Sequence, residues 1–218
     1  MKKSFLIVGL GRFGACVAKT LAQMNCDVLA IDIDEESVAA IANDVTHAIV
    51  ADSTKMDILN SLGTKNIDHA IIAIGNNLQA SILTVVNLRK LGVKMITVRA
   101  DTVEYKELFS LIGANEIIIP EEESAILLAN QVRSDSILDY YIISDNNVMV
   151  KISVGVDLKK KTIIDLDIRN RFSVNIVGII RDNKFFIPHA TDTLLIGDIA
   201  VVVGLKNDIN KFDNFLNN

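Results

Sequence analysis

The sequence is poor in cysteine and contains neither a long apolar run nor a basic one. Its 218 residues include two cysteines, Cys16 and Cys26, which predicts no disulfide and no thiolate site; we expect both to be buried as small hydrophobic side chains. No stretch reaches the roughly 18 apolar residues of a membrane-spanning helix. The apolar run that follows Lys2 and Lys3 is too short for a signal peptide. We therefore expect a cytoplasmic protein that reaches a membrane only through a partner.

The chain also lacks a positive net charge and the residue patterns typical of catalytic sites. Lys and Arg number 22 against 27 Asp and Glu, a formal charge of −5, which argues against nucleic acid as a partner. His47, His69 and His189 show no metal-ligand spacing. We find no Tyr-x-x-x-Lys pair and no Ser/His/Asp arrangement, and a hydride-transfer enzyme needs a proton donor beside its substrate. The sequence therefore predicts that the chain is not an enzyme.

What the first half contains is a regular alternation of apolar runs and helical patterns. Six short runs rich in β-branched residues are typical of strands covered on both faces. They occupy residues 5–8, 28–31, 48–50, 70–74, 95–98 and 116–119. Strands that alternate with helices in this way predict an α/β fold, a doubly wound parallel Rossmann sheet, over residues 1–120.

The second half has a different pattern. Pro120 ends the last run, and Glu121, Glu122 and Glu123 start a helical pattern that continues to Val132; we interpret residues 121–135 as a linking helix. Residues 136–218 are expected to form a small α+β domain without a glycine motif of its own. Its expected strands are 140–143, 148–154, 174–180, 184–187 and 199–203, and its helical patterns are 162–172 and 208–216.

A glycine-rich loop follows the first run. Gly9, Gly11 and Gly14 form a G-x-G-x-x-G pattern, with Asp32 18 residues after Gly14 at the end of the next run. In a dinucleotide-binding unit the first glycine makes the tight turn, the second admits the pyrophosphate, and the third lets the helix pack against the sheet. The helix amides then face the phosphates. The pattern predicts a nucleotide site.

Three acidic residues at strand ends extend this site. Asp32 can accept both hydrogen bonds of a ribose diol and would repel a 2′-phosphate, so NADP is disfavoured; the alternative is a helix cap. Asp34 is also a good cap for the next helix. Asp52, followed by Ser53, lies where a base would bind and could accept from an adenine amino group, or it could cap the helix near Lys55.

Two arginines favour a polyphosphate over a nicotinamide. Arg12 lies inside the glycine loop, and Arg99 ends the fifth run; both are expected at the carboxyl edge of the sheet, where ligands bind. Gly75 at the end of the fourth run would allow close backbone approach there. Asn76 and Asn77 after it are equally ordinary residues at a helix start.

Several motifs together resemble the cytosolic regulatory subunits of Ktr/Trk potassium uptake systems, of the KtrA/KtrC type, over the whole chain. They are Gly9-Leu-Gly-Arg-Phe-Gly14, Asp32-Ile-Asp34, Thr46-His-Ala48, Ala73-Ile-Gly75, Gln79-Ala-Ser81 and Ile119-Pro-Glu121. The resemblance implies an N-terminal and a C-terminal RCK domain joined by a crossover helix. It also implies dimers that assemble into an octameric ring on a membrane potassium-translocating subunit of the KtrB/KtrD type.

The resemblance further implies ligands. The N-terminal domain would bind ATP or ADP, and in some members NAD(H), with Arg12 reaching the terminal phosphate. Glu121 would help to bind Mg²⁺ or another divalent cation near the phosphates of a neighbouring subunit. The expected nucleotide site comprises Gly9, Gly11, Arg12, Phe13, Gly14, Asp32, Ile33, Asp34, Asp52, Ser53, Ala73, Ile74, Gly75, Asn76 and Arg99.

The C-terminal domain resembles the form that binds cyclic di-AMP at a dimer interface. Its expected site comprises Ile163, Ile164, Arg169, Asn175, Ile176, Pro188 and His189. Arg169 could pair with a phosphate, Asn175 could recognise an adenine edge, and the apolar residues could form the walls. The alternative is that the isoleucines belong to the core and Arg169 is solvated.

The sequence thus predicts a nucleotide-gated regulatory subunit of a potassium transporter that lies in the cytoplasm against the membrane. Two rival hypotheses stay open. One is an NAD-dependent oxidoreductase, and the other is an NAD(H)-binding redox sensor.

Overall fold

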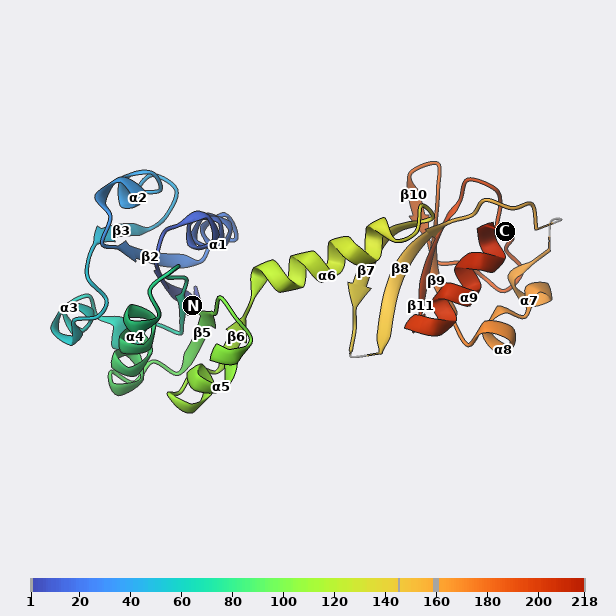
Figure 1. Cartoon of the computed structure of the whole chain (residues 1–218). Helices are drawn as coiled ribbons and strands as arrows, with labels where there is room; N and C mark the ends of the chain where they lie inside the picture. The colour runs from blue at the N-terminus through green and yellow to red at the C-terminus, as the bar shows by residue number, and fades with distance from the viewer. Residues whose placement is uncertain (1, 145, 159–160, 218) are drawn as a thin grey trace. The chain divides into compact units, whose positions relative to one another are not determined.

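A computed structural model describes residues 2–144, 146–158 and 161–217 of the chain. The chain divides into two compact units, Met1–Pro120 and Glu121–Asn218, which are coloured blue to green and yellow-green to red in Figure 1.

Unit 1 alternates strands and helices as the sequence predicts. Its six parallel strands are ordered β3-β2-β1-β4-β5-β6. The strands are β1 (Ser4–Val8), β2 (Asp27–Asp32), β3 (His47–Val50), β4 (His69–Ile72), β5 (Met95–Arg99) and β6 (Glu116–Ile118). The helices are α1 (Arg12–Gln23), α2 (Glu35–Ala39), α3 (Met56–Ser61), α4 (Leu78–Lys90) and α5 (Glu104–Leu111), with a 3₁₀ turn at Thr64–Asn66. The doubly wound parallel sheet is therefore confirmed.

Both faces of this sheet are covered, which explains why its strands are apolar throughout. Successive strand side chains point to opposite faces. In β1, Leu6 and Val8 belong to the core under α3, α4 and α5, whereas Phe5 and Ile7 belong to the core under α1 and α2 (Figure 1). The order of strands reverses between β1 and β4, and such a switch point opens a crevice at the carboxyl ends of the strands.

Helix α1 turns its smallest residues toward the sheet. It buries Gly14 and Ala18, one turn apart, against the sheet. Cys16 lies between them on the other side of the helix and is exposed, and Cys26 is half-buried; both are free thiols. The expectation that both cysteines are buried is wrong, because helical periodicity turns Cys16 away from the sheet.

Unit 2 is an antiparallel sheet with helices, and this confirms the predicted α+β unit. Its strands are β7 (Ile137–Ile142), β8 (Asn147–Ser153), β9 (Asn175–Arg181), β10 (Lys184–Phe186) and β11 (Ile199–Leu205), in the order β10-β9-β11-β8-β7. Its helices are α6 (Pro120–Val132, which begins at the unit boundary), α7 (Ile163–Leu166), α8 (Ile168–Phe172) and α9 (Lys206–Asn217). Helix α9 packs on β8 and β11 and buries Ile209, Phe212 and Leu216.

The helical pattern predicted over 162–172 is two short helices rather than one. A capping box between Thr162 and Asp165 starts α7. Asp167 then adopts a left-handed conformation with φ of 47°, which ends α7 and redirects the chain into α8. Phe172 at the end of α8 packs against Phe212 and Phe215 of α9, with ring centroids 5.4 and 4.9 Å apart.

Unit 2 also contains an ion pair in which the carboxylate is buried and the arginine is half-buried. The Arg181 guanidinium donates to both carboxylate oxygens of Asp198, at 2.8 and 2.7 Å, and also to the carbonyl of Thr193. Asp198 is 2% exposed and accepts a further bond from the Leu195 amide at 2.8 Å. Burial tends to raise the pKa of Asp198, but the hydrogen bonds from Arg181 and Leu195 outweigh it and leave this pKa below its usual value.

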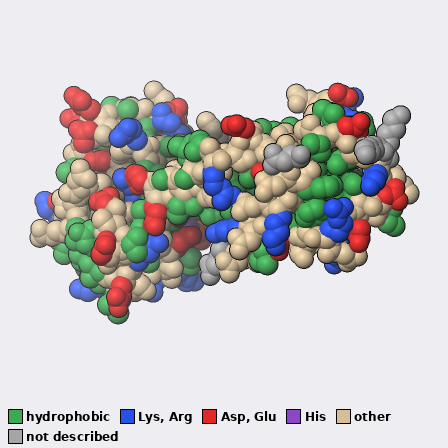
Figure 2. Space-filling view, turned by 45° about the vertical axis from the view of Figure 1, so that its right-hand side comes forward, with side chains coloured by type: hydrophobic (Ala, Val, Ile, Leu, Met, Phe, Trp, Pro, Cys, Tyr) green, Lys and Arg blue, Asp and Glu red, His purple; other side chains and the backbone are tan. Residues whose placement is uncertain are grey.

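Helix α6 differs from the other helices because none of its residues is buried. Its first turn contains Glu121, Glu122 and Glu123, which suits the positive end of the helix dipole. Ile126 and Leu128 are among its exposed apolar side chains. Figure 2 shows hydrophobic side chains at the surface between charged ones. Within the part of the chain that the structure describes, every helix is too short or too polar to cross a bilayer.

Candidate functional site

A cavity of about 510 Å³ opens at the carboxyl ends of the unit 1 strands, at the switch point between β1 and β4. It brings together eleven residues of the expected nucleotide site: Gly9, Gly11, Phe13, Asp32, Ile33, Asp52, Ser53, Ala73, Ile74, Gly75 and Arg99. Five further lining residues lie outside that expected set: Val8, Ala51, Thr54, Asn77 and Ala80. Four predicted residues do not line the cavity: Arg12, Gly14, Asp34 and Asn76.

The glycine loop forms one wall. Gly9 has φ of 91°, in the left-handed region, and a Cβ there would lie 2.8 Å from the backbone of Ala73 and Ile74. Gly14 lies under the loop, where a Cβ would be 1.9 Å from the Gly9 carbonyl oxygen. These two glycines therefore shape the loop, and Gly14 acts from behind the cavity. Around a Cβ on Gly11, by contrast, the described part of the chain leaves open space.

The loop leaves backbone donors available. Gly11 is the N-cap of α1, and within the described residues no side chain caps this helix end. The first amides of a helix have no partner within the helix and attract anions, helped by the helix dipole. The wall formed by Gly11 and Phe13 therefore suits a phosphate group.

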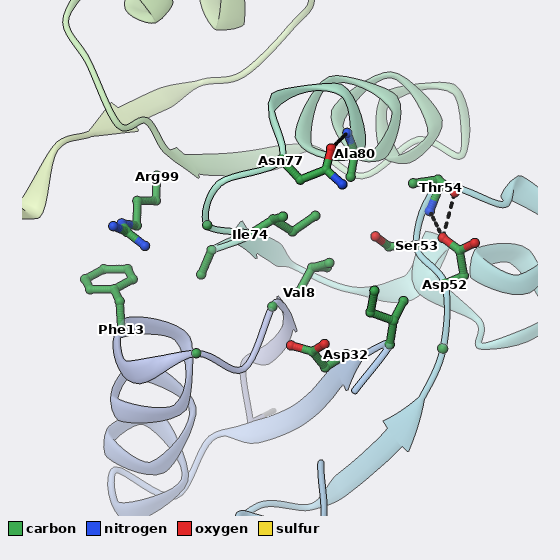
Figure 3. Close-up of a pocket in the computed structure, with 16 residues that line it drawn as sticks. Val8, Phe13, Asp32, Asp52, Ser53, Thr54, Ile74, Asn77, Ala80 and Arg99 are labelled. Atoms are coloured by element: carbon green, nitrogen blue, oxygen red, sulfur yellow. Dashed lines mark hydrogen bonds between the residues drawn. The ribbon is translucent and has the colours of Figure 1, made fainter. Parts of the chain in front are cut away.

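Asp32 lies at the base of the loop (Figure 3). Its carboxylate accepts from the Leu10 amide at 2.5 Å and from the Asp34 amide at 2.9 Å. These bonds hold the acid at the cavity while it keeps further acceptor capacity, because a carboxylate offers about four lone-pair sites. The Asp34 side chain instead accepts from the hydroxyl of Ser37 and from its amide, and it caps α2. The bond from the hydroxyl, and after it the bond from the amide, lowers the pKa of Asp34.

A second group of polar residues lines the cavity beyond β3. Asp52 accepts from the hydroxyl of Thr54 at 2.6 Å and from its amide at 3.0 Å, and these bonds hold the pKa of Asp52 below its usual value. Helix α3 starts at Met56 with Lys55 as its N-cap, so Asp52 closes a local turn rather than capping that helix. The Ser53 hydroxyl is buried against that of Thr84 at 2.7 Å.

The two arginines occupy different places. Arg99 lines the cavity, and its guanidinium lies 3.7 Å from Asp101. Figure 3 shows Arg99 and Phe13 at one end of the cavity, Asp52, Ser53 and Thr54 at the other, and Asp32 between them. Arg12 is exposed and is not among the lining residues. Asn77 accepts from the Ala80 amide as the N-cap of α4, a role that the sequence favoured as much as a binding role.

A second cavity of about 330 Å³ lies in unit 2, beside α7 and α8. It brings together all seven residues of the expected C-terminal site: Ile163, Ile164, Arg169, Asn175, Ile176, Pro188 and His189. Arg169 and Asn175 are exposed, and the Ile164 side chain is 65% exposed, so these polar and apolar groups face an open surface. Five more residues line it: Asp167, Ile168, Asn170, Val174 and Ala190.

The expected metal ligand, Glu121, does not belong to a preformed metal site in the part of the chain that the structure describes. Glu121 is exposed at the start of α6. Among the residues that the structure describes, no three His, Cys, Asp or Glu side chains form a group that could hold a metal ion.

Comparison with known proteins matches both units. Residues 5–120 match the TrkA-N domain model, and residues 147–217 match the TrkA-C domain model. The chain is 41% identical to Ktr system potassium uptake protein C of Bacillus subtilis over 98% of this chain and 97% of that protein. It is 37% identical to Ktr system potassium uptake protein A of the same organism, over 97% and 96%.

Solved structures agree on the fold. The RCK domain of GsuK has a TM-score of 0.66 and 17% identity, and it covers all of this chain, which spans 48% of that one. The GsuK channel bound to NAD has a TM-score of 0.67 and 17% identity, with 99% of this chain and 39% of that chain covered. With both domain models in order along the chain and near-complete coverage of two Ktr proteins, this chain belongs to the TrkA family of potassium uptake proteins.

Proposed function

We propose that this chain is a nucleotide-responsive regulatory subunit of a potassium uptake system, that it is not an enzyme, and that it acts at a membrane potassium-translocating partner from the cytoplasmic side. The names of the Ktr relatives support a role in potassium uptake. A nucleotide ligand is supported by the order of groups along the unit 1 cavity. Asp52 lies at one end, Asp32 in the middle, and the glycine loop and Arg99 at the other end.

An adenine nucleotide fits this order. The base lies toward Asp52, whose carboxylate accepts from an exocyclic amino group. The ribose diol donates to Asp32, and this acid disfavours a 2′-phosphate. The phosphates meet the α1 amides and Arg99, where a guanidinium gives charge-assisted hydrogen bonds. In this pose Phe13 and Ile33 supply apolar contacts.

The response to ATP and ADP is a population shift between two arrangements of the assembled subunits. A ligand moves such an equilibrium only through different binding free energies in the two states. ATP has a terminal phosphate that ADP lacks, and Arg12 on the exposed side of the loop is the group that reaches it. Glu121 binds a divalent cation together with those phosphates. ATP therefore stabilises an arrangement that ADP does not.

Assembly into dimers, and of dimers into a ring, fits the exposed apolar surface of α6. A helix that buries none of its residues and exposes Ile126 and Leu128 gains stability when another copy covers it.

Replacing Arg12 tests the nucleotide switch. In Arg12→Gln we expect ATP affinity to fall about tenfold, because one charge-assisted bond contributes about 1.5 kcal/mol, while ADP affinity changes less than about twofold. Isothermal titration with ATP, ADP and NADH measures this. The matched control is Lys19→Gln, which removes a positive charge from the same helix at an exposed ion pair with Asp44. Equal losses for ATP and ADP would contradict the role of Arg12, and NADH binding tighter than ATP would favour the redox-sensor hypothesis.

The unit 2 cavity is proposed to bind cyclic di-AMP between two copies of the chain, with Arg169 on a phosphate, Asn175 on an adenine edge and His189 at the rim. Arg169→Ala is expected to weaken cyclic di-AMP binding at least tenfold and to leave ATP binding unchanged. Lys184→Ala, an exposed cation on β10 outside the cavity, is the control. Titration of each variant measures both ligands, and an unaltered cyclic di-AMP affinity in Arg169→Ala would show that the site lies elsewhere.

A further inference from the structure

A polar cavity of about 400 Å³ in unit 2 lies apart from both nucleotide cavities, where α9 meets the segment between α6 and β7. Its lining includes Ser134, Asp135, Ser136, Ser153, Asp213 and Asn217. We call it the Asp213 cavity. Its walls offer side-chain oxygens of three kinds: carboxylate, hydroxyl and amide.

Asp213 is a buried carboxylate whose partners are all neutral. It is 9% exposed. It accepts from the hydroxyls of Ser134 at 3.0 Å and Ser136 at 2.5 Å, and from the Asn217 amide group at 3.0 Å. Within the described residues, no Lys, Arg or His forms an ion pair with it. A buried charge with neutral partners alone is costly, and a counter-charge relieves that cost.

The two serine hydroxyls at Asp213 also supply one hydrogen fewer than the contacts among these groups require. The Ser134 and Ser136 hydroxyl oxygens lie 2.7 Å from each other, and each also contacts the Asp213 carboxylate. These three oxygen–oxygen contacts form a closed ring, but two hydroxyls supply two hydrogens. One contact of the ring therefore places lone pairs against lone pairs, and a positive charge beside the ring removes that repulsion.

We propose that the Asp213 cavity binds a hard metal cation of the alkali or alkaline-earth series. Asp213 is the charged ligand, and Ser134 and Ser136 turn their lone pairs toward the ion. The Ser153 hydroxyl donates to the Ser136 carbonyl at 3.3 Å and keeps its own lone pairs for the ion. Asn217 uses its amide nitrogen on Asp213, so its carbonyl oxygen is left as an acceptor. Carboxylate, hydroxyl, carbonyl and water oxygens are ligands that hard cations prefer.

The position gives the ion a structural effect. Ser134 and Ser136 lie directly after α6, and Asp213 and Asn217 belong to α9. The ion therefore fastens α9 to the chain that leaves α6, and its occupancy sets how firmly that junction is held.

Hydrogen–deuterium exchange of the full chain without nucleotide tests the site. Samples contain KCl, NaCl, CaCl₂ or MgCl₂, each against choline chloride at equal ionic strength. We expect at least one cation to slow exchange in residues 206–217 about tenfold, and the effective salt identifies the ion. Asp213→Asn is expected to abolish this difference. Asp208→Asn, which removes an acid from the same helix outside the cavity, is expected to retain it.

A second variant decides the case if Asp213→Asn does not fold. Ser153→Ala leaves every hydrogen bond of Asp213 in place and removes one oxygen, so it should raise the ion concentration for half-maximal protection several-fold. Equal exchange of the native chain in all salts would overturn the proposal, because the hydrogen-bonded ring by itself then accounts for the cavity. Full protection by the ion in Asp213→Asn would overturn it as well. Since no nucleotide is present, neither outcome depends on the proposed regulatory function.

Discussion

Gly14→Ala is expected to destabilise unit 1 by about 3 kcal/mol and to abolish nucleotide binding. The new Cβ would lie 1.9 Å from the Gly9 carbonyl oxygen and 3.1 Å from the Ala73 Cβ, so α1 must move away from the sheet. Overpacking of this kind costs about 1–3 kcal/mol, and a backbone neighbour cannot rotate away as a side chain can. Urea titration followed by circular dichroism, with hydrogen exchange in residues 4–8 to assign the transition to unit 1, measures the loss.

Gly11→Ala separates folding from binding in the same loop. Apart from Gly11 itself and its two chain neighbours, no described atom lies within 4 Å of a Cβ at Gly11, and its backbone is in an extended conformation. We expect this variant to fold with nearly native stability yet to bind ATP more weakly, because the methyl group stands where the pyrophosphate approaches. Native stability in Gly14→Ala would show that α1 and the loop adjust without cost, and would contradict the close packing described for them.

Arg181→Met is expected to destabilise unit 2 by about 3 kcal/mol, the lower end of the cost of breaking a buried pair, because the Arg181 side chain is 34% exposed. It keeps much of the apolar stem of the side chain but leaves Asp198, which is 2% exposed, without its counter-charge. Removing one partner of a buried pair costs about 3–5 kcal/mol, mostly because the other charge stays buried. Adding Asp198→Asn to Arg181→Met should therefore restore part of the stability. Urea midpoints of the native chain, both single variants and the double variant complete the cycle.

The ion pair of Arg181 and Asp198 also predicts that the free energy of unfolding falls at acid pH. Because the pKa of Asp198 is lower in the folded state than its usual value of 3.8, the unfolded chain binds more protons at this group. The contribution to the free energy of unfolding is complete above that value and is lost as pH falls through it toward the folded-state pKa. Asp198→Asn should flatten the dependence on pH below 5. An unchanged slope in this variant would show that other carboxylates control acid unfolding.

The Rossmann sheet and most of the unit 1 cavity could be predicted because their signals are local. Gly9 and Gly14 are dictated by a left-handed turn and a close approach, and both requirements leave glycine in the sequence. Asp32 and Arg99 end strands, and the carboxyl ends of parallel strands meet at one edge. The ligand that these residues bind stays a prediction.

What could not be predicted depends on rotation within helices and on distant partners. Arg12 follows the glycine that lines the cavity, yet its side chain is exposed, because its direction depends on the start of α1. The break at Asp167 requires one left-handed residue that helical periodicity does not reveal. Arg181 lies 17 residues from Asp198, and Ser134 lies 79 residues from Asp213, so a local sequence pattern does not reveal these partners.

The place of β11 in its sheet has a consequence for how the chain is made. In unit 1 the last strand, β6, lies at an edge, and it is complete at Ile118, so that sheet can close while the rest of the chain is still being synthesised. In unit 2, β11 is the last strand of the chain but the middle strand of its sheet, paired on both sides with β8 and β9. Until Ile199–Leu205 has left the ribosome, β8 and β9 each lack a neighbour and present open edges. Synthesis therefore yields a finished unit 1 before unit 2 can form.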